Sequence, residues 1–234
     1  MGKHKLKRFA ELETFKNVMQ FGLTNKINFT HKGKWATDYF KNHNPIVLEL
    51  ACGKGEYALG LAQINPNKNY IGIDMKGNRI WKGAKTAIEQ NMNHVAFLRT
   101  YIEWLHEFFA EGEVEEIWIT FSDPFLSTTK AQKRLTSPRY LEIYSKILKP
   151  GSTINLKTDD DTLFQYTLDV LEGKEAIEKY PCDVSRFKLQ ESRNDIYNDG
   201  KAVNEALQIK TYYEQKHLQI GKKIKYVKMQ FQPS

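Results

Sequence analysis

Short apolar runs alternate with amphipathic segments from Pro45 onward, and this alternation is the dominant pattern along the chain. The apolar runs are rich in β-branched and aromatic residues on both faces, which is typical of strands buried between helices. The segments between them repeat apolar residues at helical spacing. The pattern predicts strands over residues 46–50, 70–74, 95–99, 116–121 and 152–157, and helices over residues 56–63, 78–90, 102–109, 138–148 and 162–172.

The order of these elements predicts an α/β fold, because strands that alternate with helices form a mostly parallel sheet with helices on both faces. The C-terminal third adds a short element at residues 187–190, a helix near residues 205–218 and an alternating segment at residues 224–231. One face of that last segment is mostly apolar, which suits a final antiparallel strand. Residues 188–201 are polar, and we expect a long, mobile loop there.

The residues before this alternation form a separate, basic extension. Lys3, Lys5, Lys7 and Arg8 lead into an amphipathic stretch over residues 8–19, which predicts a short helix packed on the body. We therefore divide the chain into a basic N-terminal extension with short helices, residues 1–43, and one main domain, residues 44–234.

A glycine turn follows the first strand of the main domain. The strand runs through Glu49, and Gly53 and Gly55 then open onto a helix. Such a turn lets the backbone approach a bound nucleotide without Cβ clashes and leaves helix N–H groups free. Asp74 follows the next strand about 20 residues later, where a carboxylate can bind ribose hydroxyls. These residues predict a ligand that contains adenosine.

Two nucleotide classes fit this turn, and the acidic residues separate them. NAD would bring its pyrophosphate to the turn, where Glu49 would repel it, and no second mononucleotide-binding half follows. S-adenosylmethionine carries a sulfonium and an ammonium but no phosphate. Glu49, Asp74 and Asp123, at three strand ends, suit that cation in a partly desolvated cleft. The residues favour a methyltransferase, with other nucleotide or structural roles left open.

Composition narrows the setting without fixing the partner. The chain has 234 residues, 41% hydrophobic and 27% charged, with a formal charge of +7, so either a polyanionic partner or surface lysines kept for solubility explains the charge. Cys52 and Cys182 predict reduced thiols in a cytoplasmic protein. The six histidines lack metal-ligand spacing, so we expect no metal. No apolar run is long enough to span a membrane.

An ordered set of motifs resembles the bacterial tRNA (guanine-N7-)-methyltransferases from about Asn44 to the C-terminus. The resemblance rests on these segments together: Glu49-Leu50-Ala51-Cys52-Gly53-Lys54-Gly55, Ile71-Gly72-Ile73-Asp74, Phe121-Ser122-Asp123-Pro124-Phe125, Lys133-Arg134-Leu135-Thr136-Ser137-Pro138, Leu148-Lys149-Pro150-Gly151 with Lys157-Thr158-Asp159, and Thr211-Tyr212-Tyr213-Glu214. A glycine turn alone would be a weak signal, whereas this order of motifs is a specific one.

The resemblance implies a Rossmann-like class I methyltransferase with a seven-stranded, mostly parallel sheet and an antiparallel last strand. It implies S-adenosylmethionine as donor and a variable-loop guanosine of tRNA as acceptor. Asp123 is the implied catalytic carboxylate. The implied contacts are, for the cofactor, Glu49, Gly53, Gly55, Asp74, Ile102 and Asp123, and, for the guanosine, Asp159, Thr211, Tyr212, Tyr213 and Glu214.

The sequence departs from the family pattern at three places. Ala51 replaces a usual glycine, which has no consequence if its φ stays negative. Tyr101-Ile102-Glu103 replaces an acidic residue followed by alanine, so the adenine contact uses either backbone at Ile102 or the Glu103 side chain. Residues 125–132 lack the family's basic run, and Ser127 stands where a substrate-contacting lysine is expected. The nearest cations there are Lys130, Lys133, Arg134 and Arg139.

Other interpretations of single residues stay open. Asp74 or Asp159 could cap a helix, and the tyrosines of residues 211–214 could be core residues. We expect RNA phosphate contacts from Lys3, Lys5, Lys7, Arg8, Lys133, Arg134, Lys222, Lys223 and Lys225. A non-catalytic RNA-binding relative and a small-molecule methyltransferase remain alternatives to the tRNA enzyme. The sequence leaves monomer and homodimer open.

Overall fold

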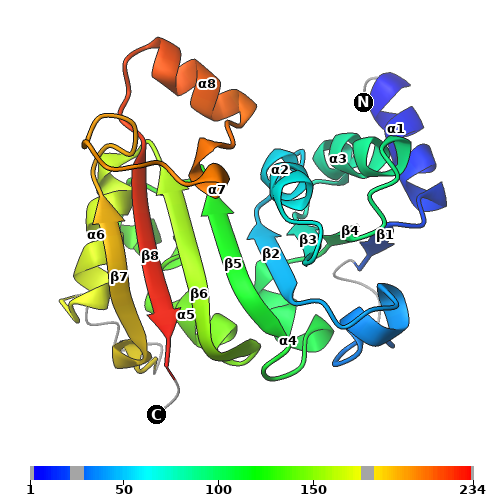
Figure 1. Ribbon diagram of the computed structural model, residues 1–234, viewed down its shortest axis with the longest axis horizontal. Helices are drawn as coiled ribbons and strands as arrows, with labels where there is room; N and C mark the ends of the chain where they lie inside the picture. Colours follow the sequence, from blue (N-terminus) through cyan, green and yellow to red (C-terminus); the bar gives the residue numbers. More distant parts are fainter. Residues whose placement is uncertain (1–2, 22–28, 175–181, 233–234) are drawn as a thin grey trace.

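One eight-stranded sheet organises the computed structural model, which describes residues 3–21, 29–174 and 182–232, without the side chains of residues 3 and 4. The strand order is β1-β4-β3-β2-β5-β6-β8-β7. The strands are β1 Val18–Gln20, β2 Ile46–Leu50, β3 Asn69–Ile73, β4 Val95–Arg99, β5 Val114–Thr120, β6 Leu148–Thr158, β7 Phe187–Arg193 and β8 Lys225–Phe231. The pairs among β1 to β6 are parallel, whereas β8 is antiparallel to both of its neighbours (Figure 1).

Two apolar clusters cover the two faces of the sheet. Leu48 and Leu50 belong to the cluster that contains residues of α4, α5 and α6. Val47 points to the other face, where the cluster contains residues of α1, α2, α3 and α7. Successive strand residues face opposite sides, which is why one strand feeds both clusters. The helices are α1 Lys3–Thr14, α2 Glu56–Ile64, α3 Gly77–Glu89, α4 Leu105–Phe108, α5 Pro138–Ser145, α6 Asp161–Leu171, α7 Glu205–Gln208 and α8 Tyr212–Gln219.

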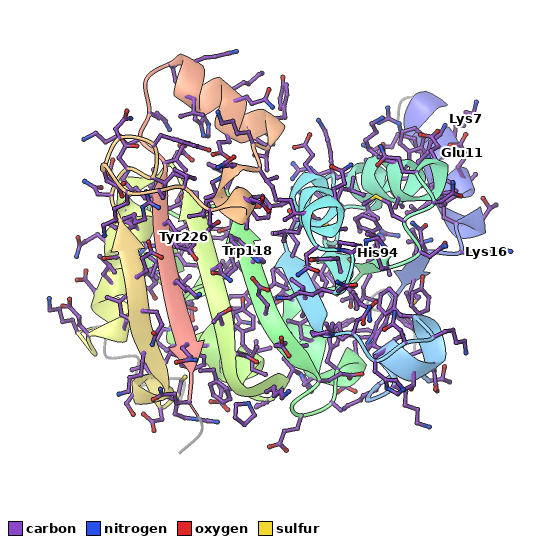
Figure 2. The ribbon with its side chains drawn as sticks, in the orientation of Figure 1. Lys7, Glu11, Lys16, His94, Trp118 and Tyr226 are labelled. Atoms are coloured by element: carbon purple, nitrogen blue, oxygen red, sulfur yellow. The ribbon has the colours of Figure 1, made fainter. Side chains whose placement is uncertain are left out.

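Large aromatic side chains join the strands on the second face. Figure 2 shows Trp118 on β5 and Tyr226 on β8, whose rings stack with centroids 6.3 Å apart. The Tyr57 ring of α2 packs on Trp118 at 4.9 Å. Aromatic groups of this size bury much apolar area, so they fix α2 on the sheet beside the start of the glycine turn.

The sheet reverses its direction of growth at β2. The chain adds β3 and β4 on one side of β2 and then returns to add β5 on the other side. The connections that leave the carboxyl ends of β2 and β5 therefore run in opposite directions, which leaves a crevice between them. Ligands of open α/β sheets bind in such a crevice. In Figure 1 these carboxyl ends lie at the top, beneath α2 and α8.

The N-terminal segment contributes more to the sheet than the sequence predicted. A single helix was expected over residues 8–19, but α1 ends at Thr14, and Val18 and Met19 lie in β1, which pairs in parallel with β4. The apolar spacing cannot separate a helix from a short edge strand at its end, because both bury the same side chains. This edge strand makes eight strands instead of seven. The boundary between residues 43 and 44 stays a prediction.

Three of the predicted elements were wrong in detail. Residues 188–193 of the expected mobile loop lie in β7, which pairs with β8. The helix expected near residues 205–218 is split into α7 and α8, because Thr211 caps a new helix. The segment at residues 102–109 is a 3₁₀ turn, Ile102–Trp104, followed by α4. The β7 error arises because strand pairing overrides a weak local pattern, whereas the split helix arises from a capping residue inside the expected helix.

Candidate functional site

Two cavities adjoin one another at the carboxyl ends of β2, β3 and β5. The Asp74 cavity holds about 230 Å³ and is lined by residues that include Asp74, Met75, Ile102 and Asp123. The Glu49 cavity holds about 110 Å³ and is lined by residues that include Glu49, Gly53, Thr211 and Tyr213. Ala51, Arg79 and Phe121 line both cavities, so the two form one continuous cleft.

Glu49 is a buried carboxylate that faces the amino end of α2. Its side chain is 3% exposed, and its Oε2 accepts a hydrogen bond from the Ala58 backbone N–H at 2.8 Å. The Thr120 hydroxyl donates to Oε1 at 3.4 Å. Burial raises the pKa of Glu49 to about 8, and these two hydrogen bonds only partly oppose the effect. The group can therefore ionise when a cation arrives beside it.

Asp74 holds the glycine turn in place. Its Oδ2 accepts from the Gly53 N–H at 2.9 Å, and its Oδ1 accepts from the Lys76 N–H at 2.7 Å. The carboxylate is 9% exposed and still lines the Asp74 cavity. Lys76, not Asp74, is the N-cap residue of α3, and no side chain caps that helix, so the helix-cap interpretation of Asp74 is wrong. One carboxylate orders both chain segments that border the cavity.

The residues of the glycine turn have different physical roles. Gly53 has φ +55°, and a Cβ at that position would meet no atom within 4 Å, so the turn leaves room beside it. Gly55 has φ +67°, and a Cβ there would lie 2.4 Å from the Phe97 ring. Gly55 is thus required by packing as well as by conformation.

Ala51 contradicts the expectation of a negative φ. Its φ is +55°, in the left-handed region that L-residues with a Cβ seldom adopt. The next residue, Cys52, donates its N–H to the Ile73 carbonyl at 3.0 Å, which ties the strained turn to β3. Such strain costs about 1–3 kcal/mol and is concentrated at functional sites.

Asp123 lies in a turn after β5 and is exposed. It lines the Asp74 cavity and also a third cavity of about 320 Å³, the Lys133 cavity, whose lining includes Glu103, Lys133 and Arg139. Two non-glycine residues that flank Asp123 have positive φ: Phe121 at +51° and Phe125 at +43°. The cleft therefore has three strained residues around it, counting Ala51.

The segment after β4 could contact adenine in either expected way, through the backbone at Ile102 or through the Glu103 side chain. Tyr101, Ile102 and Glu103 line the Asp74 cavity. Glu103 already accepts a hydrogen bond from the Tyr140 hydroxyl at 2.8 Å and lies 3.5 Å from Arg139 Nη2. The Glu103 carboxylate is therefore held at the wall, while Ile102 lies at the boundary of two cavities.

The C-terminal motif puts two side chains into structural roles and two on the surface. Thr211 is 7% exposed and caps α8 by accepting from the Glu214 N–H at 3.2 Å. Glu214 is fully buried. Tyr212 and Tyr213 are 44% and 54% exposed, so the core interpretation of these tyrosines is wrong. The Tyr212 ring lies between Lys54 and Lys216, at 4.7 and 4.5 Å from their ammonium nitrogens.

A buried ion pair that sequence reasoning missed fixes this motif to the sheet. Lys157 of β6 lies 2.8 Å from the Glu214 carboxylate, and neither side chain is exposed. Lys157 also donates to the carbonyls of Leu207 and Ile209, and the Tyr197 hydroxyl donates to Glu214. Burial lowers the pKa of Lys157 to about 8. A polar residue inside an apolar strand was the available signal.

Asp159 is engaged by His217 and Lys222 of the C-terminal segment. Its Oδ1 lies 3.1 Å from His217 Nδ1, and its Oδ2 accepts from Lys222 Nζ at 2.5 Å. The residue that caps α6 is Asp160, so the cap interpretation of Asp159 is wrong. The carboxylate therefore has partners in this structure that it would exchange for any ligand.

Two of the nine expected RNA contacts are contradicted by burial. Arg134 is 4% exposed and Lys225 is 2% exposed, and Lys225 pairs with Asp161 at 2.9 Å. Lys222 is paired with Asp159. The side chain of Lys3 lies outside the described part of the structure. Lys5, Lys7 and Lys133 are exposed.

The described residues contain no group of three or more His, Cys, Asp or Glu that could hold a metal ion. Cys52 and Cys182 are both free thiols. No helix within the described ranges is long and apolar enough to cross a membrane.

The architecture is that of the class I methyltransferases. A solved 16S rRNA methyltransferase, KamB, matches with a TM-score of 0.60, covering 90% of this chain and 97% of that one, at 14% identity. At that identity the likeness concerns the fold alone. In this chain, a cleft with three acidic residues near strand ends lies where the strand order of the sheet reverses. That is the usual position of a ligand site in an open α/β sheet.

The chain belongs to the family of tRNA (guanine-N(7)-)-methyltransferases. The model of a family described as "Putative methyltransferase" matches residues 43–227. A relative of that enzyme name from Bacteroides thetaiotaomicron is 44% identical, covering 97% of this chain and 86% of that protein. Another, from Porphyromonas gingivalis, is 46% identical and covers 92% and 85%.

Proposed function

We propose that this protein transfers a methyl group from S-adenosylmethionine to N7 of a guanosine in the variable loop of tRNA. The observation that carries the proposal is the continuous cleft at the reversal point of the sheet, where Asp74 and Asp123 line one cavity and Glu49 lines the next. The relatives at 44–46% identity carry the name of this activity.

The residues of the cleft fit the donor. Asp74, and Glu49 once it ionises, would supply negative charge for the sulfonium and ammonium of the donor, and Gly53 leaves open space beside the turn. Asp74 also presents a carboxylate where ribose hydroxyls bind. Ile102 supplies an apolar wall for a flat ring. The donor supplies an electrophilic methyl group on sulfur.

The chain's own task in the reaction is orientation and charge stabilisation. Guanine N7 has an in-plane lone pair, so no general base is required. A bond forms from N7 to the methyl carbon as the carbon–sulfur bond breaks, S-adenosylhomocysteine leaves, and the positive charge passes to the guanine ring. Asp123 stabilises that charge as it develops. Holding N7 in line with the methyl group lowers the entropic cost.

The guanosine side of the cleft divides into contacts and supports. Tyr213 is exposed and lines the Glu49 cavity, which supports a contact between Tyr213 and the base. Thr211 and Glu214 act by holding α8, through the cap and the buried pair with Lys157. Asp159 contacts guanine donor groups after it exchanges Lys222 for them.

A cationic cavity beside the cleft is the proposed start of the RNA surface. It holds about 290 Å³, and its lining includes Lys5, Lys76, Arg79 and Arg99 but no acidic residue. Lys76 and Arg79 also line the Asp74 cavity. Lys7, in contrast, lies 3.9 Å from Glu11 on α1 (Figure 2). Cations in a cavity without an acidic lining residue, next to the proposed donor site, suit the phosphates that flank a target nucleotide.

A methyl-transfer assay tests the proposal. The protein is incubated with methyl-labelled donor and unmodified tRNA, and the product nucleosides are separated. Labelled N7-methylguanosine in the variable loop is the expected result. Tight tRNA binding without transfer would favour a non-catalytic relative, which the loss of the family's basic run over residues 127–132 motivates. Donor binding without RNA affinity would favour a small-molecule methyltransferase.

The setting of the protein follows from this substrate. An enzyme of tRNA maturation works where tRNA is made and used, so we propose the cytoplasm. Both monomer and homodimer are compatible with the proposal, since each residue given a role lies on one chain. Sedimentation with and without tRNA distinguishes them.

A further inference from the structure

Arg134 lies beneath the turn that carries Asp123. It follows the 3₁₀ helix Thr128–Lys133 and precedes α5. Its guanidinium carbon lies 4.3 Å from the centroid of the Tyr166 ring of α6, and the residue is 4% exposed. A buried arginine needs partners for its planar set of donors, so the identity of those partners indicates its role.

The partners are two backbone carbonyls of the catalytic turn. Arg134 Nε donates to the Pro124 carbonyl at 2.9 Å, and Nη2 donates to the Phe125 carbonyl at 3.0 Å. These are the two residues that follow Asp123. A guanidinium that binds two successive carbonyls fixes both their separation and their direction, which a flexible ammonium cannot do equally well.

The arginine is itself rigidly held. The Ser137 N–H donates to the Arg134 carbonyl at 3.0 Å, and the Tyr144 hydroxyl donates to the neighbouring Leu135 carbonyl. The Thr136 and Thr167 hydroxyls lie 2.7 Å apart, which joins the same segment to α6. The guanidinium thus transmits the position of α5 and α6 to the turn.

The turn depends on this support because its own conformation is unfavourable. Phe121 and Phe125, on either side of Asp123, have φ of +51° and +43°. At the start of the turn, the Phe121 N–H donates to the Lys157 carbonyl at 2.9 Å. The Asp123 carboxylate makes no hydrogen bond or ion pair with the described residues, so the backbone of the turn alone sets where this side chain begins.

We propose that Arg134 is a positioning residue for the methyl transfer: it holds the Asp123-Pro124-Phe125 turn in its strained conformation and so aims the Asp123 carboxylate into the cleft. This inference rests on the proposed function. It replaces the expected phosphate contact, because a guanidinium that is 4% exposed and bound to two carbonyls is closed to RNA.

Steady-state kinetics of Arg134→Met and Arg134→Lys test the role. Arg134→Met removes both donors, and we expect kcat on unmodified tRNA to fall about a hundredfold, as for a small misplacement of a catalytic group. KM for tRNA and the donor affinity from calorimetry stay within about threefold, because neither ligand touches Arg134. Arg134→Lys keeps a charge that reaches the carbonyls, so kcat recovers to within about tenfold of the wild type.

Arg186→Met is the matched control. Arg186 also lies over an aromatic ring, that of Phe231 at 4.8 Å, but at the amino end of β7, the opposite edge of the sheet. The kcat of Arg186→Met should equal that of the wild type at a temperature where both proteins are folded. An equal loss of kcat in Arg186→Met would overturn the proposal, since general destabilisation would then explain both.

The competing role has a different signature. A phosphate contact would raise KM for tRNA, leave kcat intact and reduce the salt dependence of RNA binding by about one unit of slope in Arg134→Met. That result, or unchanged kinetics, would overturn the proposal. If Arg134→Met fails to fold, Arg134→Lys decides by the same comparison, with a kcat lowered severalfold at unchanged KM expected and a wild-type kcat contradicting it.

Failure of the proposed function would be recognised separately. A wild-type protein that transfers no methyl group to tRNA would reject that function and leave the role of Arg134 open to a structural readout. Crystals of wild type and Arg134→Lys would then be compared. A displaced Asp123-Pro124-Phe125 turn supports the inference, and superimposable turns overturn it.

Discussion

The carboxylates proposed to contact the methyl donor and those proposed to contact the guanosine meet different partners. On the donor side, Asp74 binds two backbone N–H groups and still faces the cavity, and Glu49 accepts from one N–H and one hydroxyl. On the guanosine side, Glu214 is buried against Lys157, and Asp159 lies between His217 and Lys222. Backbone N–H groups make three of the four hydrogen bonds to the donor-side acids, whereas each guanosine-side acid is paired with a lysine.

This difference separates a preformed half of the site from a half that must rearrange. Backbone donors cannot leave, so the donor side keeps its geometry when a ligand binds. A carboxylate in a partly exposed ion pair can exchange one cation for another hydrogen-bonding group at small cost. A fully buried pair cannot, because separation leaves a desolvated charge. Asp159 is therefore adaptable, and Glu214 is fixed.

The largest expected effect is a loss of stability when the buried pair of Lys157 and Glu214 is broken. Lys157→Met leaves Glu214 without its cation and frees the carbonyls of Leu207 and Ile209. Removal of one member of a buried pair typically costs about 3–5 kcal/mol of the free energy of unfolding. Urea unfolding followed by circular dichroism measures the loss.

The double variant Lys157→Met/Glu214→Gln is the control for charge. It removes both members, so we expect it to recover a large part of the loss, with a coupling of about 0.5–3 kcal/mol between the sites. Additive losses would show that the two groups do not interact in solution, and the contrast between fixed and adaptable acids would fail.

The next largest effect is a loss of kcat when the negative charge of Asp123 is removed. Asp123→Asn keeps the shape of the side chain but not its charge, so kcat should fall by about 10²–10³ if the carboxylate stabilises the developing cation. Donor affinity should change less than about threefold, because Glu49 and Asp74 hold that half. Single-turnover transfer and calorimetry measure the two quantities, and near-wild-type transfer would refute the role.

The shared location of the residues proposed to bind the donor could be predicted from the sequence because its signals are local. Glu49, Gly53 and Asp74 lie within one strand-turn-helix-strand unit, and the structure brings them to one edge as the pattern predicts. The guanosine half depends on pairs far apart in the chain, such as Lys157 with Glu214. A lysine inside an apolar strand is a local signal, but no local pattern identifies its distant partner, so the pair was missed and Arg134 was misassigned to RNA.

The fold shows the same division. The parallel strands, the helices and the antiparallel β8 follow from periodicity. Strand β1 and the extension of β7 to Arg193 do not, because an edge strand is defined by its neighbour and carries a weak pattern of its own. The positive φ of Ala51 has the same origin, since the bond from Cys52 to Ile73 in β3 fixes the turn.

A smaller effect tests the charge of Glu49. Glu49→Gln can still accept from the Ala58 N–H but cannot ionise, so the affinity for S-adenosylmethionine should fall by about tenfold to a hundredfold, the range of one charged hydrogen bond. Wild-type binding near pH 7 should release a proton, because a cation favours the ionised form of a group with pKa about 8. Calorimetry in buffers of different ionisation enthalpy measures the release, which the variant should lack.

The same substitution has a pH-dependent effect on stability. The folded pKa of Glu49 is raised from 4.5 to about 8, so the folded state keeps a proton that the unfolded state has lost in that window. The contribution is present below pH 4.5 and disappears as pH rises through 8. Glu49→Gln should therefore gain stability relative to wild type as pH increases from 5 to 8. A pH-independent difference would contradict the raised pKa.

The smallest effect distinguishes a structural from a direct role for Thr211. Thr211→Ala removes the cap of α8 and should lower the free energy of unfolding by about 1 kcal/mol, the usual cost of losing an N-cap. Thr211→Asn restores a good capping group of different shape, so stability should return. Because the hydroxyl is engaged with the Glu214 N–H, KM for tRNA should also stay within about threefold in Thr211→Asn. If that variant unfolds like wild type but its KM for tRNA rises about tenfold, Thr211 contacts the nucleotide itself. In that case the guanosine-side residues bind the substrate directly to a greater extent than the ion pairs indicate.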